Sequence, residues 1–462
     1  MKISHMIDLD EIIRERYIQP IHRKRKDFVG VEFEFPVVHF GGRPVDLDVM
    51  QELTRAFIEK FGFDKYGRDD NGRIFNTQKT ENGDDLSYDC SFNTLELSFG
   101  IESDMNTIYK RFQDYFHFIE EFLLPQEHTL TGLGINPNFL VNDNVPVANG
   151  RYRMLFHHLS SYKKYPEKKC HKYPNFGMFS CASQVQLDVD EKNVLLALNT
   201  FAKLEPFNSI LFSNSYFVDE EHHCYCSRDH FWRDSMQGYN PHNLDMYETE
   251  LHSLDEIVDY IKTESMYCLE RDGKYINFAP TTLSDYFQSD VIHGEYWNGE
   301  AYEAIDFEPR PEDIAYHRSY KFEDLTFRGT IEFRSCCEQP VSDIMTVAAY
   351  FSGLMESLPE LKGLLDNDSS LYGHGYNATE LRRIINSSGV PEFADRDEVR
   401  RLLLAVLDLS RNGLSRRGYG EEHFLDPLYD RARTLISPAK KVELEIKNGV
   451  PKDDIVREYA KL

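Results

Sequence analysis

Long apolar runs and an excess of basic charge are both missing from this chain. No stretch of its 462 residues approaches the roughly 20 apolar residues that a membrane-spanning helix needs. Lys and Arg together number 52 against 78 Asp and Glu, which gives a formal net charge of -26 at pH 7. Phosphate backbones and anionic lipid surfaces repel such a chain. We therefore expect neither nucleic acid nor a membrane among its partners.

The N-terminal segment also lacks the apolar core of a signal peptide, because it carries Asp8, Asp10 and Arg14. We expect a cytoplasmic protein, and its eight cysteines fit a compartment that keeps thiols reduced. No Cys-x₂-Cys pair is present. The run His222-His223-Cys224-Tyr225-Cys226, with His230 beyond it, is therefore a poor match to a zinc site, and a polar active-site loop is the favoured interpretation.

Common nucleotide-binding signatures and linkers are absent as well. Neither a Gly-x-Gly-x-x-Gly turn nor a Gly-x-x-x-x-Gly-Lys-Ser/Thr loop occurs, so any ATP site is not of the Rossmann or P-loop type. There is no long Pro, Gly or Ser tract, no low-complexity run and no internal repeat. We expect one catalytic domain, with a sheet-and-helix core over residues 1–345 and a helical C-terminal portion over 346–462. Early strands and late helices predict an α+β fold.

The most informative feature that is present is the run of residues 30–38, which is rich in β-formers and alternates strictly. Val31, Phe33 and Phe35 fall on one side of the predicted strand, and Glu32 and Glu34 on the other. Side chains two apart on a strand share a face. The apolar side should therefore face a core, and the two carboxylates should face a site that favours negative charge.

Three later segments show the same pattern, with apolar residues on one face of the strand, which we call the back, and polar residues on the other, which we call the front. Their polar residues are Asp89, Glu96 and Ser98 in 89–99, Gln184, Gln186 and Asp188 in 182–189, and Glu332 and Arg334 in 329–335. If the four segments form one curved sheet, their fronts converge on a cavity lined by five carboxylates: Glu32, Glu34, Asp89, Glu96 and Glu332. So many carboxylates cannot all stay ionised together without cations. All-oxygen ligation favours a hard divalent ion, Mg²⁺ or Mn²⁺.

Helical periodicity predicts helices over residues 8–19, 45–61, 151–160, 193–207, 395–411 and 425–435. A longer amphipathic helix should begin after Ser103, its predicted N-cap. The apolar stripe of this helix belongs to the core, and its members are Met105, Ile108, Phe112, Phe116, Ile119 and Leu123.

In their order along the chain, the four polar-faced strands resemble those of the glutamate–cysteine ligases. More broadly, they are similar to the carboxylate–amine ligases that share the glutamine synthetase-type catalytic fold. Supporting matches extend the resemblance over residues 29 to about 420, and they are 151–154, 211–215, Ser227-Arg228, Trp232 and 412–417. The resemblance implies a curved, mostly antiparallel sheet that forms a funnel-like cavity flanked by helices.

The resemblance also implies an activity, which is the ATP-dependent ligation of the γ-carboxylate of glutamate to the amine of cysteine. The reaction would pass through a γ-glutamyl phosphate and form the first step of glutathione-type thiol synthesis. The five carboxylates would hold two or three Mg²⁺ ions, and Gln184 would stand where some relatives place a metal-binding His. Arg334 would contact the γ-phosphate, and Arg228 would bind phosphate or the α-carboxylate of glutamate. For each Arg, an ordinary ion pair is the alternative.

Two other functional interpretations stay open. The same chemistry could serve a different amine or a peptide acceptor. A sheet scaffold without catalysis is the second alternative, although retention of five costly carboxylates and Arg334 argues against it. Cys336 and Cys337 follow the last strand, and a packed pair is favoured over a redox pair. The sequence assigns no role to the basic loop 163–172 and does not indicate an oligomeric state.

Overall fold

One large antiparallel sheet organises the fold. The structure, a computed structural model, describes residues 7–216 and 224–462. Within them, nine strands form this sheet in the order β12-β13-β7-β1-β5-β4-β3-β2, and β6 pairs with the far end of β1. The strands are β1 Val29–His39, β2 Lys65–Arg68, β3 Ile74–Gln78, β4 Asp85–Tyr88, β5 Thr94–Glu102, β6 His128–Leu130, β7 Ser183–Asp188, β12 Glu323–Leu325 and β13 Thr330–Phe333. The four segments with polar fronts therefore belong to one sheet, as the sequence predicted.

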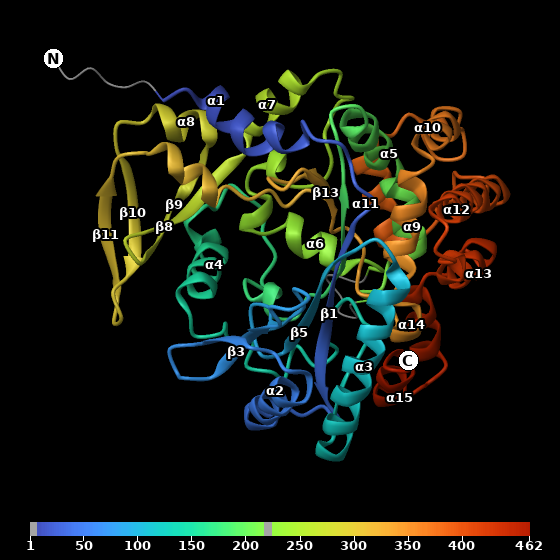
Figure 1. Cartoon of the computed structure of the whole chain (residues 1–462), viewed down its shortest axis with the longest axis horizontal. Helices are drawn as coiled ribbons and strands as arrows, with labels where there is room; N and C mark the ends of the chain where they lie inside the picture. Colours follow the sequence, from blue (N-terminus) through green and yellow to red (C-terminus); the bar gives the residue numbers. More distant parts are fainter. Residues whose placement is uncertain (1–6, 217–223) are drawn as a thin grey trace.

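A second, smaller sheet had no counterpart in the sequence predictions. In the described part of the chain it has four antiparallel strands in the order β11-β10-β9-β8. Their bounds are β8 Ser265–Arg271, β9 Lys274–Thr282, β10 Ile292–Trp297 and β11 Tyr302–Phe307. Figure 1 shows this sheet, in yellow, at one side of the molecule and the C-terminal helices, in orange and red, at the other.

Helices surround the large sheet and make up the C-terminal part, which confirms the predicted α+β class. They are α1 Leu9–Ile13, α2 Leu47–Phe61, α3 Met105–Leu123, α4 Gly150–Ser160, α5 Val194–Phe212, α6 Ser227–Arg233, α7 Leu254–Thr263, α8 Leu283–Gln288, α9 Thr346–Met355, α10 Leu358–Asp366, α11 Ala378–Ser388, α12 Arg396–Arg417, α13 Asp426–Thr434, α14 Pro438–Lys447 and α15 Lys452–Tyr459. None of the helices in the described residues is both long and apolar enough to cross a membrane.

The apolar back of β1 packs on α3. The ring centroids of Phe33 and Phe112 lie 5.6 Å apart and those of Phe35 and Phe116 lie 5.7 Å apart, and all four side chains are buried. The predicted N-cap of α3 is wrong by one residue. Asp104 caps the helix, because its carboxylate accepts the N–H of Asn106.

The other end of the sheet is backed by α5 and α9. Phe333 of β13 stacks on Phe351 of α9 with 4.1 Å between centroids, and it meets Phe201 of α5 edge-on at 4.8 Å. Because helices cover the apolar back from β1 to β13, the alternating polar side chains of these strands are left on the opposite face. The sequence pattern and the packing thus agree on which face is available for chemistry.

A buried arginine ties the C-terminal helices to the core. Arg382 of α11 donates to Asp229 of α6 at 2.6 and 3.1 Å and also pairs with Glu205 of α5. Its third contact is the carbonyl of Ser335 at 3.1 Å, just beyond β13. One apolar core also continues from the sheet into the C-terminal helices. These contacts support the predicted single domain, which stays a prediction.

We expect Arg382→Ala to lower the free energy of unfolding by about 3–5 kcal/mol, because it leaves two buried carboxylates without their cation. The matched control is Arg383→Ala, since the neighbouring Arg383 is half exposed and its partner Asp245 keeps a second cation, Arg233. This control should cost under about 1 kcal/mol. Urea unfolding followed by fluorescence and circular dichroism measures both. Equal losses of unfolding free energy in the two variants, or a separate unfolding transition for residues 346–462, would contradict the expectation.

Candidate active site

The register of the strands places the predicted acidic residues on one face. Glu34 of β1 lies opposite Glu96 of β5. Two residues earlier, Glu32 lies between Ser98 of β5 and Gln184 of β7. Directly paired residues of antiparallel strands point to the same side. The carboxylates of β1 and β5 therefore share a face with Gln184, although they come from segments far apart in the sequence.

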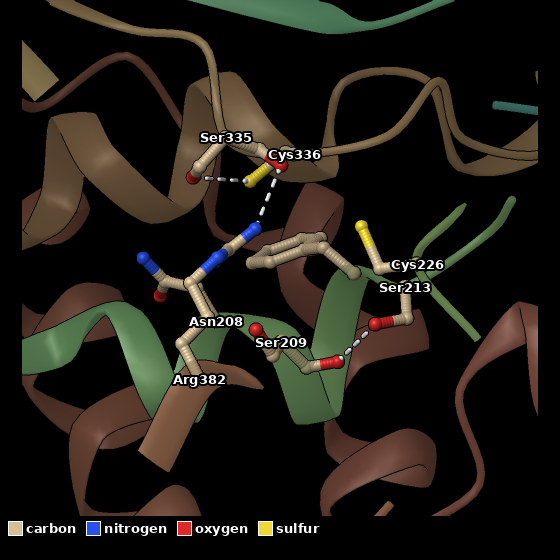
Figure 2. A pocket seen from close by; sticks show the side chains of 8 residues that line it. Asn208, Ser209, Ser213, Cys226, Ser335, Cys336 and Arg382 are labelled. Carbon is tan, nitrogen blue, oxygen red and sulfur yellow. Dashed lines mark hydrogen bonds between the residues drawn. The ribbon is translucent and has the colours of Figure 1, made fainter. Parts of the chain in front are cut away.

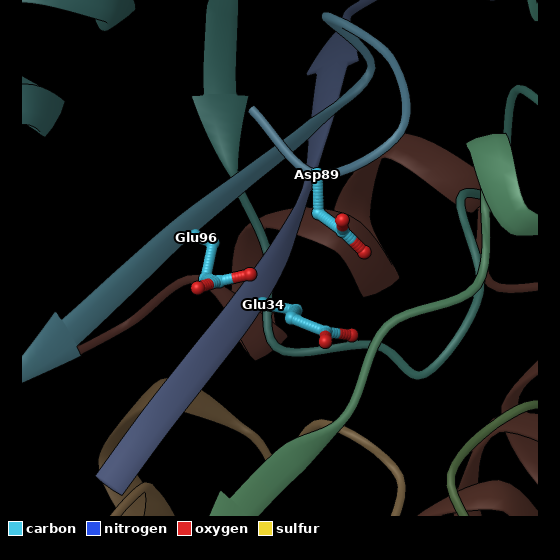
Figure 3. A group of neighbouring side chains, drawn as sticks. All are labelled: Glu34, Asp89 and Glu96. Atoms are coloured by element: carbon cyan, nitrogen blue, oxygen red, sulfur yellow. The ribbon is translucent and has the colours of Figure 1, made fainter. Parts of the chain in front are cut away.

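Three carboxylates gather closely on this face. One oxygen each of Glu34, Asp89 and Glu96 lies within 4.8 Å of the other two, and Figure 3 shows the three side chains on β1, on β5 and in the connection that precedes β5. The Tyr152 hydroxyl donates to Asp89 Oδ1 at 3.2 Å. The Ser98 hydroxyl donates to Glu96 Oε1 at 2.6 Å. Neutral donors thus orient two of the three acids.

Glu34 is the most constrained member of this cluster. The backbone N–H of Ala182 donates to its Oε2 and the Gln184 amide donates to its Oε1, both at 2.7 Å. Burial and the charge of Asp89 nevertheless raise the pKa of Glu34 to about 8. For Glu96, burial and the neighbouring carboxylates, Glu32 first, raise the pKa well above its ordinary value. Burial is the larger cause in both residues, and the charges of the neighbouring carboxylates add to it.

A hard divalent cation fits this cluster. The ligand atoms are carboxylate oxygens, and a dication would neutralise the charge that raises these pKa values. Elsewhere in residues 7–216 and 224–462 no comparable group of three or more His, Cys, Asp or Glu side chains occurs. For the zinc alternative, His222 and His223 lie outside the described residues, and Cys224, Cys226 and His230 do not gather with a further ligand.

Glu32 and Glu332 lie outside the three-carboxylate cluster. Burial raises the pKa of Glu32, while the nearby charge of Arg334 opposes the rise. Glu332 of β13 already has partners, because it accepts the Gln186 amide at 3.0 Å and forms an ion pair with Arg334. The structure thus places three of the predicted ligands together, and a fourth, Glu332, forms an ion pair with Arg334.

The two predicted arginines differ in how they are held. Arg334 directly follows β13, forms the ion pair with Glu332, and its charge also acts on Glu32. Arg228, at the start of α6, is buried and donates to the carbonyls of residues 334, 335 and 336 at 3.2–3.4 Å. Arg228 therefore holds the segment that follows β13. Its Nε atom has no hydrogen-bond partner within the described residues.

Two further residues of this face were missed by the sequence reasoning. Asp85 of β4 lies opposite Ser98, and burial raises its pKa to about 6. The alternation of Asp85, Leu86, Ser87 and Tyr88 was an available signal, although a four-residue strand is a weak one. The guanidinium of Arg151, at the start of α4, interacts electrostatically with Asp89 and Glu96. The sequence reasoning used this residue only as a family match.

Comparison with known proteins decides the family. The model of glutamate-cysteine ligase family 2 (GCS2) matches residues 28–452. The chain belongs to this family. The chloroplastic glutamate–cysteine ligase of Nicotiana tabacum is 24% identical over 437 residues, which cover 92% of this chain and 77% of that protein. The chloroplastic glutamate–cysteine ligase of Medicago truncatula is 23% identical over 437 residues, which cover 92% of this chain and 79% of that protein.

Among solved structures, a glutamate–cysteine ligase of Francisella tularensis in complex with AMP resembles this family member. The alignment has 12% identity and a TM-score of 0.48, and it covers 95% of this chain and 89% of that one. The family match confirms the resemblance inferred from the four polar-faced strands. The cytoplasmic location stays a prediction, because the plant relatives are named as chloroplastic proteins.

We expect Mg²⁺ to raise the melting temperature of this ligase-family protein through the carboxylate cluster. Binding to the folded state alone stabilises by about 2.7 kcal/mol at 100 times the dissociation constant. Glu34→Gln should lose most of this shift. The matched control is Glu120→Gln, because Glu120 is a carboxylate outside the cluster that accepts from Thr129 and the Leu130 N–H. Thermal unfolding with and without Mg²⁺ measures both, and an equal shift in the two variants would refute the site.

Proposed function

We propose that this protein ligates the γ-carboxylate of glutamate to the amine of cysteine with ATP, through a γ-glutamyl phosphate. The observation that carries the proposal is the cluster of Glu34, Asp89 and Glu96 on the open face of a sheet that also presents Arg334. Membership of the glutamate-cysteine ligase family gives this acidic face its chemical context.

The reaction needs an activated carboxylate, because forming an amide from a free carboxylate and an amine in water is uphill. Transfer of the γ-phosphoryl group of ATP to the carboxylate gives it a leaving group, which the amine then displaces. In our proposal Glu34, Asp89 and Glu96 hold Mg²⁺, with Glu32 and Glu332 beside them. The bound ions would neutralise phosphate charge during the transfer.

Arg334 is the proposed contact of the transferred phosphoryl group. A guanidinium can bind two phosphate oxygens at once, and it stays charged at any physiological pH. The ion pair with Glu332 fixes the direction of the side chain before a ligand arrives. The charge of Arg334 also acts on Glu32, so this arginine faces the acidic side of the sheet.

Arg228 and Gln184 have supporting roles in this proposal. The terminal nitrogens of Arg228 hold the segment that carries Arg334, which leaves Nε for the α-carboxylate of glutamate or a phosphate oxygen. The amide nitrogen of Gln184 donates to Glu34. Its amide oxygen is therefore the atom of this side chain that can contact a metal ion or the nucleotide.

We expect the purified protein, supplied with Mg²⁺, ATP, glutamate and cysteine, to release ADP and phosphate in equal amounts as an amide forms. Mass spectrometry of the product and a coupled ADP assay measure the two sides of the reaction. Replacing cysteine in turn with other amines and with peptides tests the alternative acceptors. Release of AMP and pyrophosphate would indicate an adenylate and would overturn the acyl-phosphate scheme.

Arg334→Lys should lower kcat by roughly 10²-fold or more, the range seen when one donor to a developing charge is removed. The KM for cysteine should change much less, because the amine reacts after the phosphoryl transfer. Arg328→Lys is the matched control, since Arg328 is exposed in the turn between β12 and β13. Steady-state kinetics of both variants decide the assignment. A kcat near wild type with a lower melting temperature would make Arg334 a structural ion-pair partner.

A further inference from the structure

The basic loop 163–172 concentrates positive charge in a chain whose formal net charge is -26. Five of its ten residues are lysines, and only one is acidic. The loop lies between α4 and β7, two elements that border the proposed site. Tyr152 of α4 donates to Asp89, and the backbone N–H of Ala182, just before β7, donates to Glu34. Both ends of the segment that contains the loop are therefore fixed beside the carboxylate cluster.

The lysines of this loop differ in whether a carboxylate neutralises them. Lys163, Lys164 and Lys169 are all exposed. Lys164 pairs with Glu295 of β10 at 2.9 Å. Neither Lys163 nor Lys169 forms an ion pair within residues 7–216 and 224–462. The charges of Lys163 and Lys169 are therefore available to an anion that approaches from solvent.

Contacts hold the basic loop over the C-terminal end of α6. The backbone N–H of His171 donates to the carbonyl of Asp234, the residue that follows α6, at 2.7 Å. Beyond the loop, the ring of Phe176 meets that of Trp232 edge-on, with 5.4 Å between their centroids. The position of the loop is thus set by a helix that also contributes to the proposed site.

The helix α6 connects the loop to the arginines of the site. Arg228 lies at its start, six residues before the contact with the loop, which corresponds to about 9 Å along a helix axis. The rings of Trp232 and Tyr320 lie 5.4 Å apart. Two residues after Tyr320, the carbonyl of Phe322 accepts the backbone N–H of Arg334 at 3.0 Å. The loop therefore lies near the phosphate-binding residues without belonging to them.

Other cations around α6 are already paired with carboxylates. Figure 2 shows Arg382 in the lining of a narrow crevice. Its guanidinium forms ion pairs with Glu205 and Asp229, so this crevice offers no free positive charge. Arg233, at the end of α6, pairs with Asp245 at 3.3 Å. An anion that approaches this side of the molecule would therefore meet the exposed lysines of the basic loop first.

The proposed substrates differ in how strongly an acidic protein repels them. ATP, even as its magnesium complex, carries more negative charge than glutamate, and cysteine has no net charge at neutral pH. A net charge of -26 opposes the approach of ATP most of all. Positive charge near a binding site raises the local concentration of an anion, over a range of about 8 Å at physiological ionic strength.

We propose that the basic loop 163–172 attracts ATP to the acidic face of the sheet and so offsets the repulsion by the rest of the chain. This inference rests on the proposed function, because ATP is the nucleotide of that reaction. Lys163 and Lys169 act through their charge and not through a fixed contact. Their effect therefore depends on ionic strength and on the charge of the ligand.

The test measures binding of a non-hydrolysable ATP analogue, with Mg²⁺, to the full-length protein by isothermal titration calorimetry. No glutamate or cysteine is present, so the measurement does not need turnover. We expect Lys163→Gln/Lys169→Gln to weaken binding by about threefold to tenfold at roughly 0.01 M salt. The loss should fall below about twofold at roughly 1 M salt, where charges are screened beyond about 3 Å.

Two control variants separate the position of the charge from its amount. Lys60→Gln/Lys110→Gln changes the net charge equally, but these exposed lysines lie on α2 and α3, away from the basic loop. This variant should bind the analogue as the wild type does. Lys163→Arg/Lys169→Arg keeps both charges and should also bind normally.

Steady-state kinetics at low salt add a second readout. In Lys163→Gln/Lys169→Gln the KM for ATP should rise most, the KM for glutamate less, and the KM for cysteine least, in the order of their charges. A general loss of folding would not produce this order. Circular dichroism and the melting temperature of each variant check that the fold is retained.

The proposal is wrong if the loop variant binds the analogue as tightly as the Lys60→Gln/Lys110→Gln control at low salt. A loss of affinity that persists unchanged at high salt, or equal rises of the three KM values, would also overturn it. Unchanged ATP affinity would leave an acidic macromolecule as the partner of the loop. A wild-type protein that binds the analogue but forms no amide would contradict the proposed function alone.

Discussion

The crowding of Glu34, Asp89 and Glu96 on one face of the sheet is the constraint on which the rest of the site depends. Like charges this close raise one another's pKa values, so the cluster persists only if other interactions hold the strands in register. The apolar packing of Phe33 and Phe35 on α3 supplies that hold from behind. The packing on the back of the sheet thus offsets the charge repulsion on its front, and this repulsion is the reason why we propose a cation site there.

The arginines around this face fall into two groups with different energetics. Arg382 is buried with two carboxylates and connects the C-terminal helices to the core. Its charge is therefore neutralised within the fold and is not available to a ligand. Arg334 pairs with one carboxylate and is only partly buried, which leaves its charge able to act on the acidic face. Arg228 stands between the two groups, because its terminal nitrogens bind backbone carbonyls while its Nε stays unpaired in the described part of the chain.

The segment that follows β13 connects these features. Its backbone carbonyls accept hydrogen bonds from Arg228 and Arg382. The Sγ atom of Cys337 lies 3.6 Å from that of Cys226. The Glu338 carboxylate accepts a hydrogen bond from the backbone N–H of Glu34 at 3.1 Å. A change at any one of these contacts would therefore shift both the arginines of the site, Arg228 and Arg334, and the carboxylate cluster.

The sequence by itself determined which side chains share a face, because the period of two in a strand is a local property. It therefore predicted the fronts of β1, β5, β7 and β13, and the ordered motifs predicted the family. Local pattern also came within one residue of the start of α3, but it ended α5 at Phe207 although the buried helix continues past Pro206 to Phe212. Only the tertiary structure decided the order and register of the strands, which place Glu34 opposite Glu96. It also decided that Glu332 forms an ion pair with Arg334. The hydrogen bonds of Arg228 to the segment after β13 and the pairing of the four-stranded sheet also depend on contacts between distant segments. Such contacts are fixed by packing and chain closure, and no local periodicity records them.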